Sequence, residues 1–196
     1  MIRQGKDTDK EALMQLWKCC FPQDSDSFIV FYFNNVYRNE EMLVYMENEQ
    51  LIASLQIIPY QIKKGYAILH GGYISGAMTH PDYRMKGYMS KLLLTSFDVM
   101  IEKGYDYAFL IPQEKGLIDM YAKYGFHLCE PNKQYIENYV LKNPKQWSII
   151  QQVFYEENGI WLEEEPISPN EHKGMIKRLN PGAEEIKTLY LGMMLD

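Results

Sequence analysis

The sequence predicts an α/β (α+β) protein with a mixed, mostly antiparallel central sheet flanked by helices, and a short C-terminal extension. Over residues 1–140, hydrophobic periodicity alternates in the order helix, helix, three strands, helix, strand, helix, strand, strand. A strand–helix–strand unit therefore lies within a sheet whose other strands follow one another through tight turns. The length of 196 residues suits one well-cored domain and an appendage, which we expect at residues 1–141 and 142–196.

Two helices open the chain. Residues 8–11 have the spacing of a capping box, and an apolar stripe follows them at helical intervals. This stripe consists of Leu13, Leu16, Trp17, Cys20 and Phe21. Pro22 ends the first helix, because proline disrupts a helix interior. Asp24 and Ser25 can cap the second helix.

Three strands and their turns form the next region. Residues 42–47, 50–62 and 66–79 are apolar segments separated by short turns, which predicts an antiparallel meander. Asn48 and Glu49 supply the first turn. Pro59 indicates a bulge or an edge within the second strand, because proline cannot donate to a sheet ladder.

The period then changes to that of a helix. Amphipathic spacing over residues 89–100, followed by Gly104, predicts a helix with a glycine C′ residue. A buried strand at 107–111, a shorter helix at 118–122 and two strands at 126–129 and 135–141 complete the domain.

The segment from residue 142 onward is too short for a core of its own. We expect strands at 159–162 and 174–179, then a helix from Asn180 and Pro181 with an apolar stripe. This extension packs on the main domain or on a second subunit. A homodimer and intramolecular docking are both open.

Composition excludes several functions. The formal net charge of −6 argues against a nucleic-acid binder and is compatible with a cationic partner. Neither a membrane-length apolar run nor a signal peptide is expected. The three cysteines are the adjacent Cys19 and Cys20 and the distant Cys129, without a C-x-x-C pair, which favours a reducing, cytoplasmic location. The four histidines lack metal-ligand spacing, so no metal site is expected. His80 reads as structural, whereas His70 precedes glycines that indicate a kink or a ligand's close approach.

The most informative stretch joins the third strand to the long helix. There the sequence runs Ala-Met-Thr-His-Pro-Asp-Tyr-Arg-Met-Lys-Gly-Tyr-Met-Ser over residues 77–90. A helix N-terminus has unpaired amides and a positive dipole end, so it attracts phosphate. Arg84 and Lys86 add positive charge, and Gly87 permits a close backbone approach. These features predict an anion site, although ordinary solvated loop residues would look similar.

This stretch resembles the acetyl-CoA pyrophosphate loop of the GNAT superfamily of N-acetyltransferases, whose pattern is Q/R-x-x-G-x-G/A. Arg84 and Gly87 match the pattern, and Met89 departs from its small final residue, as in the enhanced-intracellular-survival branch. The resemblance covers roughly residues 1–140 and implies a GNAT-like sheet with acetyl-CoA as co-substrate. The implied cofactor-binding residues are Ala77, Met78, Thr79, Arg84, Met85, Lys86, Gly87, Tyr88, Met89 and Ser90.

A second segment, residues 118–126, resembles the family's L-Y-x-K-x-G-F sequence. In that family the tyrosine protonates the departing thiolate of coenzyme A, and Tyr121 occupies the matching position. Tyr124 is the nearest rival, and a half-buried core tyrosine is the alternative for Tyr121. By the same resemblance, amides near Met78 and Thr79 stabilise the oxyanion.

The general base is not visible in the sequence. The open candidates are Glu114, Asp119 and a carboxylate of the acidic tail. In the survival branch the C-terminal carboxylate is given this role, which makes Asp196 the least favoured candidate. The resulting hypothesis is direct attack of a primary amine, on a small molecule or a protein, upon acetyl-CoA in a ternary complex. A non-catalytic acyl-CoA-binding or partner-binding module is the alternative. A nucleotide-binding protein is a weaker third, because no Walker or G-x-G-x-x-G pattern occurs.

Overall fold

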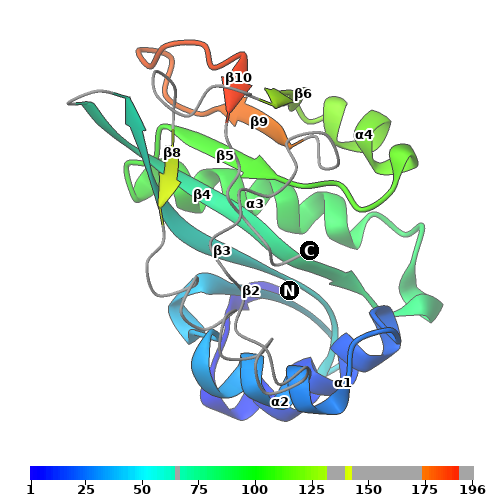
Figure 1. Ribbon diagram of the computed structural model, residues 1–196. Coiled ribbons are helices and arrows are strands. Elements are labelled where there is room, and N and C mark those ends of the chain that lie inside the picture. The colour runs from blue at the N-terminus through cyan, green and yellow to red at the C-terminus, as the bar shows by residue number, and fades with distance from the viewer. Residues whose placement is uncertain (65–66, 132–139, 143–173, 190–196) are drawn as a thin grey trace. The chain divides into compact units, whose positions relative to one another are not determined.

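The computed structural model describes residues 1–64, 67–131, 140–142 and 174–189 (Figure 1). The chain forms two compact units. Unit 1 comprises Met1–Ile58 and Ile74–Val99, and unit 2 comprises Pro59–Tyr73 and Met100–Asp196.

The helices and strands follow the predicted order closely. The helices are α1 (Lys10–Cys20), α2 (Asp26–Asn35), α3 (Tyr88–Glu102) and α4 (Lys115–Ala122), with 3-10 turns at Asp7–Asp9, Asn39–Glu41 and Pro81–Tyr83. The strands are β1 (Ile2–Gln4), β2 (Met42–Glu47), β3 (Gln50–Lys64), β4 (Ala67–Thr79), β5 (Tyr107–Leu110), β6 (His127–Leu128), β7 (Glu130–Pro131), β8 (Val140–Lys142), β9 (Met175–Arg178) and β10 (Thr188–Leu189).

The main sheet has the strand order β1-β2-β3-β4-β5-β9-β6, with β8 paired to β3. The pairs β1–β2, β2–β3, β3–β8, β5–β9 and β6–β9 are antiparallel, whereas β4 and β5 are parallel. The short strands β7 and β10 form a separate parallel pair. A mixed, mostly antiparallel sheet with flanking helices was predicted, and this fold class is confirmed.

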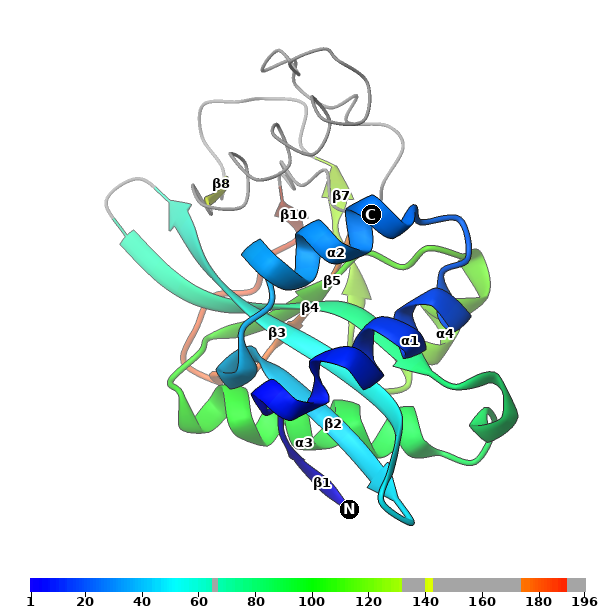
Figure 2. The same ribbon diagram turned by 90° about the horizontal axis from the view of Figure 1, so that it is seen from below.

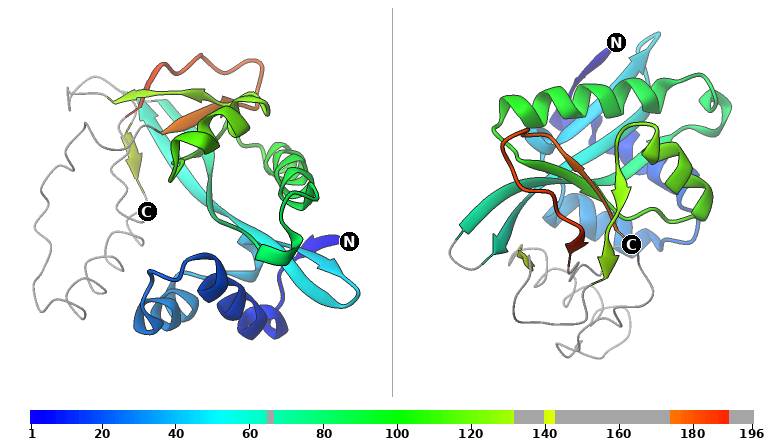
Figure 3. Two further views of the ribbon diagram at one scale, coloured as in Figure 1. Left: turned by 90° about the vertical axis from the view of Figure 1, so that its right-hand side faces the viewer. Right: turned by 90° about the horizontal axis from the view of Figure 1, so that it is seen from above.

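In unit 1, α1 and α2 lie on one face of the strands and α3 lies on the other (Figures 2 and 3). Trp17 of α1 is the centre of the first layer, because its ring contacts those of Phe28, Tyr32 and Phe33 on α2. Most of the predicted apolar face of α3 is buried, and Met89 at its start is half-buried. The buried residues are Leu92, Leu93, Ser96, Phe97 and Met100.

The β2–β3 hairpin of unit 1 ends in a tight turn. Asn48 and Glu49 both adopt positive φ angles, of 48° and 64°, as a two-residue hairpin turn requires. Glu47 and Gln50 form the last pair of residues before the turn. The turn predicted here is confirmed.

Unit 2 is built around an aromatic cluster. The rings of Tyr60, Tyr73 and Phe109 lie within 6.0 Å of one another, centroid to centroid. Gly71 is required beside this cluster, because a Cβ there would lie 2.9 Å from the Phe109 ring. This packing, rather than a ligand's approach, accounts for the glycine that follows His70.

The C-terminal segment differs in part from the prediction. The strand expected at 174–179 is present as β9, between β5 and β6. The helix expected from Asn180 is wrong, because residues 179–187 form a turn and irregular chain before β10. The Asn180 side-chain oxygen accepts the Gly182 N–H (2.9 Å), so the segment adopts an Asx-type turn. The division of the chain at residue 141 stays a prediction.

Other differences are local. The capping box expected at residues 8–11 is replaced by the 3-10 turn, in which the Asp9 carboxylate accepts the Lys6 N–H (2.8 Å). Ser25 caps α2 as predicted, accepting the Phe28 N–H (3.2 Å). The expected strand at 159–162 and nearly all of that at 135–141 lie outside the described residues, as does Asp196.

Candidate functional site

The end of β4 is tied to its neighbours in unit 1. Gly76 has a φ of +53° and faces the Trp17 ring, so the strand departs from regular geometry there. Met78 is only 1% exposed, and the His80 N–H donates to the Ile52 carbonyl of β3 (2.8 Å). The predicted residues Ala77, Met78 and Thr79 therefore end the strand in a fixed position.

The Thr79 carbonyl is a further anchor. It accepts hydrogen bonds from the Cys20 thiol of α1 (3.4 Å) and from Nε of Arg84 (3.2 Å). Burial raises the pKa of the Cys20 thiol, so the thiol remains a protonated donor. Arg84 is thus held against the strand end, beside the start of the loop that follows.

The loop between β4 and α3 begins with the turn Pro81–Tyr83. The His80 ring nitrogen Nδ1 accepts the Asp82 N–H (3.3 Å), so the structural role expected of His80 is confirmed. Residues 84–87 are exposed, and both Met85 (φ +61°) and Gly87 (φ +78°) are left-handed. Turns containing left-handed residues direct consecutive amides into one concavity, an arrangement that binds anions. A Cβ at Gly87 would meet no atom within 4 Å, so the space beside it is open.

The first turn of α3 continues this anion-binding arrangement. The Lys91 N–H donates to the Gly87 carbonyl (3.1 Å), and the amides of Tyr88, Met89 and Ser90 precede that bond. Amides in these positions have no acceptor within their own helix, and they carry the positive end of its dipole. Lys86 adds a cation, which lies 5.0 Å from the Tyr83 ring centroid and donates to the Asp82 carbonyl (3.1 Å). The structure therefore brings together the loop residues that the sequence predicted, at a site suited to a phosphate or diphosphate.

Tyr121 lies in unit 2, on α4. Its side chain is only 7% exposed, and its ring contacts that of Phe126 at 5.9 Å. Gly125 (φ +85°) closes the segment as predicted, and a Cβ there would lie 2.8 Å from Nζ of Lys177. The rival Tyr124 is half-buried, and its carbonyl accepts a hydrogen bond from that Nζ (2.8 Å).

The two described carboxylate candidates for a general base also belong to α4. Glu114 occupies the N-cap position of the helix, and Asp119 lies within it. Both side chains are exposed.

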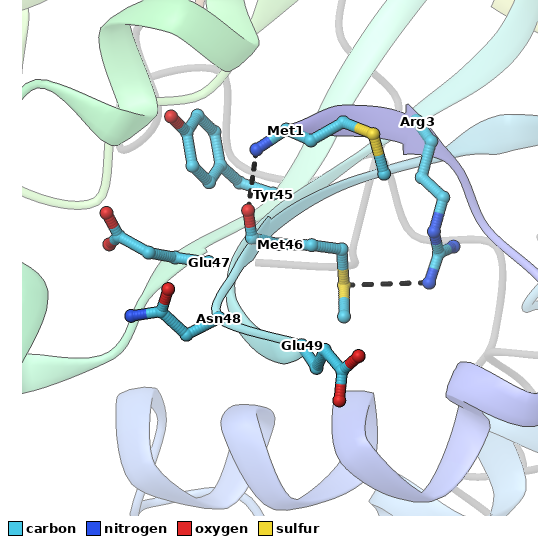
Figure 4. Close-up of a pocket in the computed structure, with 7 residues that line it drawn as sticks. All are labelled: Met1, Arg3, Tyr45, Met46, Glu47, Asn48 and Glu49. Atoms are coloured by element: carbon cyan, nitrogen blue, oxygen red, sulfur yellow. Dashed lines mark hydrogen bonds between the residues drawn. The ribbon is translucent and has the colours of Figure 1, made fainter.

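A separate hollow of about 510 Å³ lies on the β2–β3 hairpin of unit 1 (Figure 4). It is lined by Met1, Arg3, Tyr45, Met46, Glu47, Asn48 and Glu49. Arg3 is paired with Asp9 (2.6 Å), while Glu47 and Glu49 add negative charge. The hollow is therefore poorly suited to an anionic cofactor, and the loop is the better candidate.

Metal-binding clusters and membrane-spanning helices are two further kinds of feature. Among the residues that the structure describes, no group of three or more His, Cys, Asp or Glu side chains is arranged to hold a metal ion. None of the helices in that same part of the chain has the length and apolar character needed to cross a membrane.

The sequence matches the family model of the acetyltransferase (GNAT) domain over residues 1–129. The chain therefore belongs to the GNAT acetyltransferase family, which agrees with its sheet and with the loop at the start of α3. No curated protein matches the sequence significantly.

Solved structures show the same fold. The ribosomal-protein-S18-alanine N-acetyltransferase of Escherichia coli is similar at 12% identity and a TM-score of 0.58, covering 95% of this chain and 97% of that one. Eis1 of Mycobacterium abscessus is similar at 12% identity and a TM-score of 0.57, and the match covers 66% of this chain and 31% of that one. N-acetylglutamate synthase of Neisseria gonorrhoeae, complexed with coenzyme A and N-acetyl-glutamate, is similar at 16% identity and a TM-score of 0.53. The match covers 92% of this chain and 35% of that one. The chain spans about a third of the length of Eis1 and of two GCN5-related N-acetyltransferases.

Proposed function

We propose that this protein transfers an acetyl group from acetyl-CoA to a primary amine. The observation that carries the proposal is the loop of residues 84–87, with left-handed Met85 and Gly87, leading directly into the N-terminus of α3. This is an anion-binding arrangement at the position where the family's pyrophosphate motif falls. Membership of an acetyltransferase family supports acyl transfer, and the loop supports coenzyme A as the carrier.

The reaction proceeds by direct attack in a ternary complex. The amine must be neutral to attack, because a free alkyl ammonium has a pKa of about 10.4. A new N–C bond forms on the thioester carbon, amides near Met78 and Thr79 stabilise the oxyanion, and the C–S bond then breaks. Tyr121 donates its hydroxyl proton to the departing thiolate. Glu114 and Asp119 are the described candidates for the base that removes the amine proton.

The acceptor is proposed to be cationic, because the chain carries a net charge of −6. The aliphatic Met89 at the end of the motif supports a relationship to the enhanced-intracellular-survival branch, as does the similarity to Eis1. A cytoplasmic location and a homodimer are further parts of the proposal.

The activity is tested by mixing the protein with acetyl-CoA and a panel of amines that includes polyamines, amino sugars and peptide N-termini. Thiol release that depends on one class of amine supports the proposal. Absence of turnover with every amine, together with absence of coenzyme A binding by calorimetry, contradicts it. Binding without turnover favours the non-catalytic acyl-CoA module, for which the burial of Tyr121 is the supporting observation.

The position of the cofactor is tested with two glycines flanking α3. Gly87 (φ +78°) and Gly104 (φ +73°) have nearly the same backbone conformation, and both face open space. Gly87→Trp and Gly104→Trp therefore impose similar backbone strain, but only the former fills the space beside the loop amides. We expect Gly87→Trp to abolish coenzyme A binding and Gly104→Trp to leave it unchanged. Equal affinities of the two variants for coenzyme A would contradict a cofactor site beside the loop.

A further inference from the structure

The β2–β3 hairpin contacts the loop from both of its ends. The Tyr83 hydroxyl, just before the loop, donates to Oε1 of Gln50 (3.1 Å). The Tyr88 hydroxyl, just after it, donates to the Glu47 carboxylate. Glu47 and Gln50 are directly paired across the hairpin turn. The paired residues Glu47 and Gln50 therefore each accept a hydrogen bond from a tyrosine that flanks residues 84–87.

Aromatic contacts reinforce these two hydrogen bonds. The rings of Tyr83 and Tyr88 lie 6.2 Å apart, and the Tyr88 ring meets that of Tyr45 edge-on at 4.8 Å. Tyr45 and Glu47 are two residues apart in β2, so they share one face of the strand. Figure 4 shows their side chains on one side of the hairpin, with Met46 and Arg3 on the other.

The Tyr88 hydroxyl is a donor near neutral pH. The hydrogen bond to Glu47 raises the pKa of Tyr88 to about 12, so this phenol stays protonated. The acceptor for Tyr83 is the amide oxygen of Gln50, which does not ionise.

We propose that Tyr83 and Tyr88, held by Gln50 and Glu47, form a clamp that positions the loop for the diphosphate of coenzyme A. The inference rests on the proposed function. Residues 84–87 are exposed and include two left-handed residues, so they would lose conformational freedom when an anion binds. Fixing both ends of the loop beforehand reduces that entropic cost, which increases affinity. The tyrosines are positioning residues, since the ligand contacts are made by backbone amides.

The test is calorimetric titration of coenzyme A into variants that remove one hydroxyl at a time. Tyr83→Phe and Tyr88→Phe keep the ring contacts, and each is expected to weaken binding by about fivefold, the loss typical of one hydrogen bond. Tyr45→Phe is the matched control, because its ring lies in the same cluster while its hydroxyl has no hydrogen bond within the described chain. Glu47→Gln retains a neutral acceptor for Tyr88 and is expected to weaken binding less than Tyr88→Phe does.

Hydrogen exchange supplies a readout that needs no ligand. In the free protein, the amides of residues 85–90 are expected to exchange faster in the two Phe variants than in wild type, with unchanged exchange in α1. Wild-type affinity in both Phe variants would overturn the clamp while leaving the proposed function intact. An equal loss in Tyr45→Phe would also overturn it. Failure of the wild-type protein to bind coenzyme A would overturn the proposed function itself.

Discussion

The two parts of the expected machinery are built in opposite ways. The loop of unit 1 is exposed along residues 84–87 and offers backbone amides, with Met85 and Gly87 in left-handed conformations. The tyrosine of unit 2 is a single side chain on a regular helix, only 7% exposed and packed on Phe126. The binding proposed for the loop would therefore depend on backbone shape and its supports, whereas the proton transfer proposed for Tyr121 would depend on one hydroxyl.

The units also differ in the hydrogen bonds that an aspartate carboxylate makes to distant parts of the chain. In unit 1 the Asp9 carboxylate accepts two hydrogen bonds from Arg3, at 2.6 and 2.8 Å, and one from the Lys6 amide. In unit 2 the Asp106 carboxylate accepts from neutral groups, the His70 amide and the Asn180 side chain, both at 2.9 Å. An ion pair thus secures the start of the chain, while neutral donors secure the turn after β9.

The largest expected effect concerns Tyr121. Tyr121→Phe should lower turnover by about 100-fold, the usual scale for loss of a general acid, while coenzyme A affinity stays unchanged. Steady-state thiol release and calorimetry measure the two quantities. The neighbouring Tyr124→Phe serves as control and should keep its turnover. Comparable activity in wild type and Tyr121→Phe would remove the assigned role.

The next effect concerns the two aspartates. The hydrogen bonds from Arg3 lower the pKa of Asp9, so its charged form stabilises the fold above the unfolded-state pKa of about 3.9. Asp9→Asn should lower the free energy of unfolding by about 2 kcal/mol at pH 7, since its bonds involve charged groups. Asp106→Asn, which keeps one acceptor oxygen, should cost about 1 kcal/mol.

The pH dependence distinguishes the ion pair from simple packing. As pH falls through the lowered pKa of Asp9, the wild-type protein loses this contribution and approaches the Asp9→Asn variant. Urea unfolding of the wild-type protein and of Asp9→Asn at pH 7 and pH 3 measures the difference between their free energies of unfolding. A gap between the two proteins that is the same at both pH values contradicts the ion-pair account.

The smallest effects concern two serines of unit 1. Ser54 is fully buried, and its hydroxyl has no partner within the described part of the chain, so Ser54→Ala should raise the free energy of unfolding by up to about 1 kcal/mol. Ser25 caps α2, and Ser25→Ala should lower it by about 1 kcal/mol. Thermal unfolding shows whether each substitution raises or lowers the free energy of unfolding. Destabilisation by Ser54→Ala would reveal a hydrogen-bond partner for the Ser54 hydroxyl.

Sequence patterns predicted the elements that depend on local signals. The α3 face, the Gly104 and Gly125 helix ends and the Asn48–Glu49 turn follow from periodicity and turn chemistry. Insertion of β9 between β5 and β6 did not, because it pairs residues far apart in the chain. Helical spacing after Asn180 was misleading, since the Asn180 side chain stabilises a turn instead.

The candidate site divides in the same way. Residues 84–90 were predicted as a site from a contiguous motif, since an anion site at a helix start is a local structure, and that assignment stays a prediction. The support from Glu47 and Gln50 was not predicted, because these residues lie 41 and 33 positions from their tyrosine partners. Tyrosines on both sides of the loop were visible in the sequence, but nothing there identified their acceptors.

The central claim is that the diphosphate of coenzyme A binds to the amides at the start of α3. A crystal structure of the protein soaked with coenzyme A tests it most directly. We predict diphosphate oxygens within hydrogen-bonding distance of backbone amides between Lys86 and Ser90. Coenzyme A bound at another place, with these amides facing only solvent, would contradict the account.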